Sequence, residues 1–144
     1  ADVVLLAGTG GETRVLLVQR SHPPFAGRWA LPGGRVRPGE DVEAAARREL
    51  GEETAVPAGP LELVGVYSAP GRDPRGRYVT FAYAGRLPEP VPPSAGSDAR
   101  GASWVPVVRA AASPGLAFDH SAILADALAG TGRGTAAEES ELWK

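Results

Sequence analysis

The feature that most constrains this chain is the acidic stretch of residues 34–56, which reads GRVRPGEDVEAAARRELGEETAV. Its composition predicts a helix from residue 41 to about residue 54, with an acidic start that suits the helix dipole. Residues three and four positions apart share one helix face. Glu49, Glu52 and Glu53 are therefore expected to direct their carboxylates into one small volume, where like charges repel.

Two readings of this acidic face remain open. It is either an ordinary solvated face, paired with Arg47 and Arg48, or a site for a hard divalent cation such as Mg²⁺ or Mn²⁺, which prefers oxygen ligands. The surroundings favour the cation, because Pro32, Gly33 and Gly34 supply a turn with free backbone amides directly before the helix.

The spacing around the helix carries a resemblance to a known family. Gly34 is followed after five residues by Glu40, and Glu40 after seven residues by the run RELGEETAV, residues 48–56. This pattern resembles the Nudix box, the signature of the Nudix hydrolase family. One position departs from it, since Ala55 stands where the family has glycine. That glycine serves a left-handed exit from the helix, which alanine adopts at a cost of about 1–2 kcal/mol.

The resemblance implies an α+β fold in which a mixed β-sheet is sandwiched between helices. The apolar runs at residues 3–6 and 15–18 are expected to form a hairpin. Further strands are expected at residues 29–31, 61–67, 78–83 and 104–108, the second and third of these forming a long hairpin. A closing helix is expected after Asp119, as far as Gly130.

Composition bounds the remaining possibilities. A chain of 144 residues with 43% hydrophobic residues suits one globular domain, which we place at residues 1–130, followed by a tail at residues 131–144. The net charge of −2 does not indicate binding to nucleic acid or to an anionic membrane, so neither is expected as a partner. The absence of cysteine excludes disulfides and fits a reducing compartment, so we expect a cytoplasmic location. The oligomeric state stays open, with a homodimer as one option.

Nudix enzymes cleave a nucleoside diphosphate linked to another moiety, X, and the resemblance implies attack by water on one phosphorus. It assigns Glu49, Glu52 and Glu53 to the metal, with Glu49 or Glu52 sharing the role of base. Glu40 is expected to take part in a hydrogen bond or to assist from the rim of the metal site.

On the same grounds, Arg48 is expected to orient the carboxylates. Gly33 and Gly34 of the turn are grouped with Arg48 as substrate-binding positions.

Family members add an acid from a late loop, and Asp98 is the candidate here. The competing reading is a simple turn aspartate within Gly96-Ser97-Asp98, and Glu89 is the alternative acid.

Two further runs bear on the substrate. Residues 70–76, PGRDPRG, and residues 116–120, LAFDH, resemble the ADP-ribose pyrophosphatase branch of the family. Arg72 and Arg75 offer planar forks to phosphate or ribose oxygens. Alternatively, this is a surface hairpin in which Arg72 pairs with Asp73. In the second run, Phe118 and His120 either contact the substrate or anchor the start of the closing helix.

Three functions are therefore carried forward. The leading one is a Mg²⁺-dependent enzyme that cleaves ADP-ribose, a small-molecule nucleotide, to AMP and ribose 5-phosphate. The second is a (d)NTP pyrophosphatase of the nucleotide-pool sanitising type. The third is a non-catalytic Nudix-related domain that senses ADP-ribose, against which the intact carboxylates count.

Overall fold

The two apolar runs near the start of the chain form the predicted hairpin, which lies at the centre of the sheet. The computed structural model describes residues 1–96 and 99–130, so Asp98 and the tail at residues 131–144 lie outside the described residues. Strand β1 (Asp2–Ala7) pairs antiparallel with β2 (Arg14–Arg20), and the 3₁₀ turn η1 (Gly10–Glu12) lies between them.

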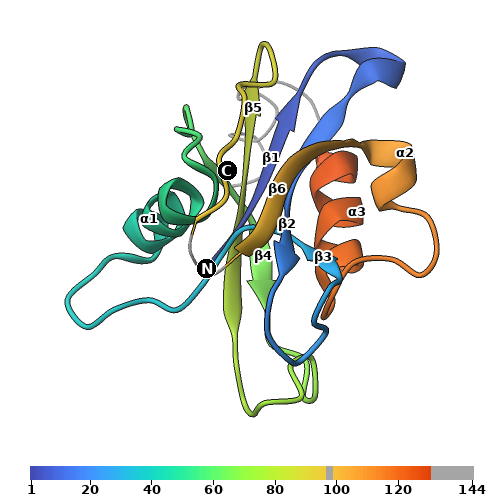
Figure 1. Cartoon of the computed structure of the whole chain (residues 1–144). Coiled ribbons are helices and arrows are strands. Elements are labelled where there is room, and N and C mark those ends of the chain that lie inside the picture. Colours follow the sequence, from blue (N-terminus) through green and yellow to red (C-terminus); the bar gives the residue numbers. More distant parts are fainter. Residues whose placement is uncertain (97–98, 131–144) are drawn as a thin grey trace, which may run out of the picture.

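The remaining strands extend the sheet on both sides of this pair (Figure 1). On one side, β1 pairs in parallel with β5 (Thr80–Leu87), which pairs antiparallel with β4 (Glu62–Tyr67). On the other side, β2 pairs antiparallel with β3 (Trp29–Ala30) and with β6 (Ala99–Pro106). The result is a mixed six-stranded sheet with the order β3-β2-β1-β5-β4, in which β6 joins β2.

Alternation along β1 produces two separate cores, because successive side chains of a strand point to opposite faces. Val3 and Leu5 pack with Leu50 of helix α1 (Val42–Thr54). Val4 and Leu6 pack with Ile123, Leu124 and Ala127 of helix α3 (His120–Gly130).

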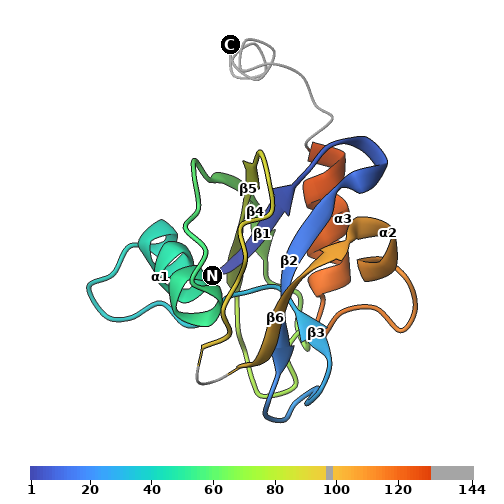
Figure 2. The ribbon, with the colours of Figure 1, turned by 45° about the horizontal axis from the view of Figure 1, so that its top comes forward.

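The helices accordingly cover the two faces of the sheet. Helix α1 lies on one side, while α3 and the short helix α2 (Val107–Ala110) lie on the other (Figures 1 and 2). The expected sheet sandwiched between helices is confirmed. No helix within residues 1–96 and 99–130 is long and apolar enough to cross a membrane.

Several strand boundaries differ from the prediction; β5, for example, runs from Thr80 to Leu87 rather than over residues 78–83. Strand β6 begins at Ala99 rather than at Trp104, and Val107 starts helix α2 rather than continuing a strand. The small and glycine-containing segment before Trp104 has a loop-like composition, yet it pairs with β2 along its length. A neighbouring strand supplies hydrogen bonds that local composition does not reveal.

The end of α1 confirms the left-handed exit expected there. Ala55 has φ 59° and ψ 16°, and its N–H donates to the carbonyl oxygen of Gly51 at 2.9 Å. Alanine thus adopts the conformation that glycine occupies more easily, and the chain still turns into Val56, which is fully buried.

Candidate active site

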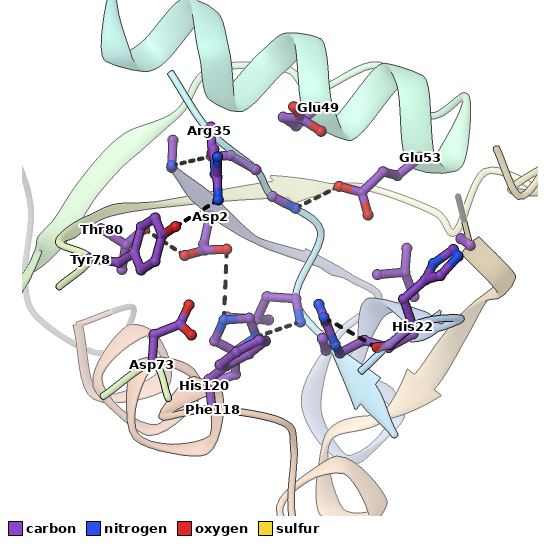
Figure 3. Close-up of a pocket in the computed structure, with 18 of the residues that line it drawn as sticks. Asp2, His22, Arg35, Glu49, Glu53, Asp73, Tyr78, Thr80, Phe118 and His120 are labelled. Carbon is purple, nitrogen blue, oxygen red and sulfur yellow. Dashed lines mark hydrogen bonds and ion pairs between the residues drawn. The ribbon is translucent and has the colours of Figure 1, made fainter. Parts of the chain in front are cut away.

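A cavity of about 870 Å³ lies where several parts of the fold meet (Figure 3). Its walls come from α1, from the start of β1, from the end of β2 and the loop after it, from the turn after β3, from the β4–β5 loop and from the start of α3. The charged side chains that line it are Asp2, Arg20, Arg35, Glu49, Glu52, Glu53, Arg72, Asp73 and Arg75.

Helix α1 delivers the predicted carboxylates to one end of this cavity. Glu53 accepts a hydrogen bond from the backbone N–H of Gly33 at 3.0 Å. Burial raises the pKa of Glu53 to about 8, with a further increase from Glu49 that the Gly33 bond partly opposes. Glu49 and Glu53 therefore form a close pair whose negative charges are mutually unfavourable.

Arg48 forms hydrogen bonds with three further carboxylates around the site, those of Glu40, Glu49 and Glu52. Its guanidinium donates to Glu40 at 2.7 and 3.0 Å, to Glu49 at 2.7 Å and to Glu52 at 3.3 Å. A fifth bond, at 2.9 Å, reaches the carbonyl oxygen of Arg35. These contacts use the full donor set of an arginine, which agrees with the predicted role of orienting the carboxylates.

Glu40 lies outside the cavity lining and serves this arrangement indirectly. The hydrogen bonds from Arg48, together with one from the backbone N–H of Arg37, lower the pKa of Glu40 to about 2. A carboxylate that stays charged in this way keeps Arg48 in place.

The three carboxylates do not form a ready-made metal cluster. Within residues 1–96 and 99–130, no three acidic or histidine side chains meet closely enough to hold a metal ion. Glu52 is half exposed and turns toward Arg37, at 3.6 Å, and Arg48. The two arginines draw the carboxylate of Glu52 away from the close pair of Glu49 and Glu53.

The donor set nevertheless fits a hard divalent cation. All three side chains present carboxylate oxygens, the ligands that Mg²⁺ and Mn²⁺ prefer, and all three line the same cavity. For Glu53, the hydrogen bond found within the described residues comes from a neutral backbone N–H. A cation beside Glu49 and Glu53 would balance the charge of this close pair.

The two glycines of the turn leave room for different neighbours. A Cβ at Gly33 would collide with the backbone of Ala1 and Asp2, so this position requires glycine. A Cβ at Gly34 would collide with the carboxylate of Glu49 and would displace it from its place in the cavity.

Arginines and aromatic rings line the opposite end. Arg72 donates to Asp119 through Nε at 2.8 Å and Nη2 at 2.6 Å, and Arg75 donates to Asp73 through Nε and Nη2 at 3.0 and 2.7 Å. The alternative pairing of Arg72 with Asp73 is therefore not formed. The Arg72 side chain is 6% exposed, whereas that of Arg75 is 44% exposed. Arg75 is the more accessible of the two to a ligand.

The second run resembling the ADP-ribose branch also reaches the cavity. Phe118 has a left-handed backbone, with φ 53°, and its ring lies 4.8 Å from the guanidinium carbon of Arg20 and 5.2 Å from that of Arg75. His120 accepts a hydrogen bond from the N–H of Leu31 at 3.0 Å, and burial lowers its pKa. Both side chains line the cavity and also anchor the start of α3.

Sequence reasoning did not single out several cavity residues, among them Asp2, Arg20, Arg35, Tyr78 and Thr80. A signal for the first was present: alternation along the first strand puts position 2 on the same face as the buried Val4 and Leu6. A charged side chain at such a position calls for a polar partner.

Neither candidate for the acid of the late loop is seen in the cavity within the described residues. Asp98 lies outside the described residues, so its role stays a prediction, while Glu89 is exposed and does not line the cavity. Gly96 does line it, and its N–H donates to the carbonyl oxygen of Glu53 at 3.1 Å.

Comparison with known proteins agrees with this geometry. A family model for the NUDIX domain matches residues 1–127. The chain belongs to the Nudix family. The ADP-ribose pyrophosphatase of Methanocaldococcus jannaschii is 40% identical to this Nudix chain over 120 residues, which are 80% of this chain and 66% of that protein. The ADPR responsive transcriptional repressor NtrR of Acinetobacter baylyi is 34% identical over 130 residues, or 89% of this chain and 52% of the repressor.

Among solved structures, the NUDIX domain of Shewanella oneidensis NrtR complexed with ADP ribose superimposes with a TM-score of 0.84. The two sequences are 32% identical, and the match covers 90% of this chain and 85% of that one. This Nudix chain therefore spans between about half and two thirds of the curated relatives, and most of the isolated domain.

Proposed function

We propose that this chain is a divalent-cation-dependent pyrophosphohydrolase, with Mg²⁺ or Mn²⁺ as the cation, that cleaves ADP-ribose to AMP and ribose 5-phosphate. The observation that carries the proposal is one cavity with the α1 carboxylates at one end and Arg75 at the other. Its volume of about 870 Å³ lies in the range that suits a nucleotide-sized ligand. The 40% identity to an ADP-ribose pyrophosphatase supports the same substrate.

The cation would be held by Glu49, Glu52 and Glu53. When bound, it neutralises phosphate oxygens and makes a water molecule more acidic. The contribution of the chain is to hold these oxygens in place: Arg48 orients Glu49 and Glu52, and the N–H of Gly33 orients Glu53.

The proton of the attacking water passes to a carboxylate at this end of the cavity. Glu49 or Glu52 fills that role, because each lines the cavity and is held by Arg48, which itself stays charged. Asp98 remains the proposed additional acid, from the segment that follows Gly96 in the sequence.

At the other end, Arg75 is proposed to bind the diphosphate–ribose part of the substrate. Within the described residues, Asp73 takes its Nε and Nη2 groups, which leaves Nη1 for a ligand oxygen. Arg72 acts from behind this surface, where its pairing with Asp119 ties the β4–β5 loop to the start of α3.

A second candidate is an ADP-ribose sensor without turnover. It is favoured by the similarity to a domain complexed with ADP ribose and to an ADPR responsive repressor. The complete set of α1 carboxylates favours the enzyme.

A substrate panel with product identification separates the candidates. The protein is incubated with Mg²⁺ and either ADP-ribose or a dNTP mixture, and the products are separated. AMP with ribose 5-phosphate supports the proposal. Release of pyrophosphate from a dNTP at a higher kcat/KM favours the sanitising type, and tight ADP-ribose binding without any product favours the sensor.

Replacement of Arg75 tests the substrate-binding end. Arg75→Ala is expected to lower kcat/KM for ADP-ribose. The loss of transition-state stabilisation calculated from the ratio of kcat/KM values should be about 1.5–3 kcal/mol, the range for a charge-assisted hydrogen bond. Arg77→Ala is the matched control, because Arg77 is an exposed arginine of the same loop outside the cavity lining. Equal activity of the two variants would remove Arg75 from the binding site.

A further inference from the structure

Asp2 is a further charged residue of the cavity, at the start of β1 (Figure 3). Its side chain is 13% exposed and lines the cavity between the α1 carboxylates and the ring of His120 (Figure 3). The hydroxyl of Thr80 donates to Oδ2 at 2.5 Å, and Oδ1 lies 3.7 Å from Nε2 of His120.

These neighbours hold Asp2 as a hydrogen-bond acceptor. Because the N–H of Leu31 donates to Nδ1 of His120, the proton of the neutral ring is on Nε2, the nitrogen that faces Asp2. Thr80 takes one of about four lone-pair positions of the carboxylate, and His120 approaches a second from beyond hydrogen-bond distance. Acceptor positions therefore remain for a ligand in the cavity.

Gly33 links Asp2 to the α1 carboxylates, because it contacts both Asp2 and Glu53. The Oδ1 atom of Asp2 leaves no room for a Cβ at Gly33, and the N–H of the same glycine donates to Glu53. On the other side, the charge of Asp2 acts on Arg72 and Arg75. Asp2 thus lies in the cavity between the α1 carboxylates and the two arginines.

We propose that Asp2 is a specificity-determining residue that selects a sugar over a further phosphate at the X position. The inference rests on the proposed function, because a ligand that contacts both the cation at the α1 end and Arg75 at the other end passes Asp2. A pentose presents hydroxyl groups that donate to a carboxylate, whereas a third phosphate presents only negative oxygens. A third phosphate near the Asp2 carboxylate would bring two like charges together in a partly buried cavity, where they repel strongly.

The test compares ADP-ribose with ATP, which carry the same nucleoside and differ in the group beyond the diphosphate. Asp2→Asn removes the charge and keeps the size of the side chain. The ratio of kcat/KM for ADP-ribose to that for ATP is expected to fall by about tenfold or more, because a charged hydrogen bond is lost and a repulsion is relieved. A purely structural role would lower both values equally.

Two further variants keep the outcome unambiguous. Thr80→Val retains the carboxylate but removes the hydroxyl that orients it, so the ratio should shift in the same direction by a smaller factor. Glu62→Gln neutralises an exposed carboxylate on β4 outside the cavity and should leave the ratio unchanged. An unchanged ratio in Asp2→Asn, or an equal loss on both substrates, overturns the inference.

Failure of the proposed function can be told apart from failure of this inference. If the wild-type protein binds ADP-ribose without cleaving it, the enzyme proposal fails, and the same variants are compared by the ratio of the two dissociation constants. Asp2→Asn should then weaken ADP-ribose binding relative to ATP. A ratio of dissociation constants that does not change overturns the role of Asp2.

Discussion

At the scale of single residues, the environments of Glu52 and Glu53 differ although both line the cavity. Glu53 is mostly buried beside Glu49, with a raised pKa, whereas Glu52 is half exposed and lies near Arg37 and Arg48. Replacement of the carboxyl group of Glu53 by an amide should therefore stabilise the metal-free protein but impair catalysis. The same replacement at Glu52 should impair catalysis alone.

Glu53→Gln is expected to raise Tm in the absence of metal by about 3 °C or more, because a buried carboxyl beside Glu49 is unfavourable at neutral pH whether it stays charged or takes up a proton. The same variant should lower kcat by several orders of magnitude in Mg²⁺, since a neutral amide does not balance a cation. Thermal unfolding in a chelator and steady-state kinetics measure the two effects.

Glu52→Gln is the matched comparison. It should lower kcat to a similar extent but leave the metal-free Tm nearly unchanged, because its charge is already balanced by arginines at the surface. A lower Tm for Glu53→Gln, or near-normal turnover in either variant, would contradict the assigned roles.

At the scale of elements, the end of α1 carries a strain that can be removed. Ala55 is held at φ 59°, a left-handed conformation that glycine adopts without a steric penalty. Ala55→Gly is expected to stabilise the protein by about 1 kcal/mol and to leave kcat unchanged, since the carboxylates keep their positions. Chemical denaturation measures the difference.

Ala125→Gly is the control for this substitution. Ala125 is an exposed residue inside α3, where glycine costs about 1 kcal/mol relative to alanine. The two changes should therefore have opposite signs. A destabilised Ala55→Gly variant would show that the exit from α1 does not strain alanine.

The start of α3 makes stability depend on pH. Burial lowers the pKa of His120 in the folded state, so below its ordinary value the unfolded chain takes up a proton that the folded chain refuses. This contribution is present above about pH 6.5 and is lost as the pH falls, at up to about 1.4 kcal/mol per pH unit. Denaturation between about pH 7.5 and 5 measures the slope.

His120→Gln should remove this positive contribution to the slope of stability against pH, even if it lowers stability at every pH. His22→Gln replaces the other histidine of the chain, which is exposed at the edge of the cavity, and should leave the slope as in the wild type. Identical slopes for wild type and His120→Gln would refute the buried neutral histidine.

At the scale of the whole molecule, local patterns predicted most of the elements and the clustering of the α1 carboxylates at one end of the cavity. The helix that carries Glu49, Glu52 and Glu53 follows from spacing alone, and the exit at Ala55 follows from its place in the box. Both depend on residues within a few positions of one another, which a sequence displays directly.

Contacts between distant segments were beyond such reasoning. Arg72 pairs with Asp119, 47 positions away, and Asp2 meets Thr80, 78 positions away. Strand β6 likewise depends on pairing with β2 rather than on its own composition. These features belong to the folded topology, which brings together residues whose sequence neighbourhoods give no sign of the partner.

The proposed hydrolysis of ADP-ribose is tested most directly by incubating the protein with ADP-ribose and Mg²⁺ and measuring the products. Binding of ADP-ribose is measured in parallel on the same preparation. The wild-type protein should form equal amounts of AMP and ribose 5-phosphate, and a chelator should abolish both. Glu52→Gln should bind ADP-ribose and form almost no product. Binding of ADP-ribose by the wild-type protein in Mg²⁺ without any AMP would contradict the account.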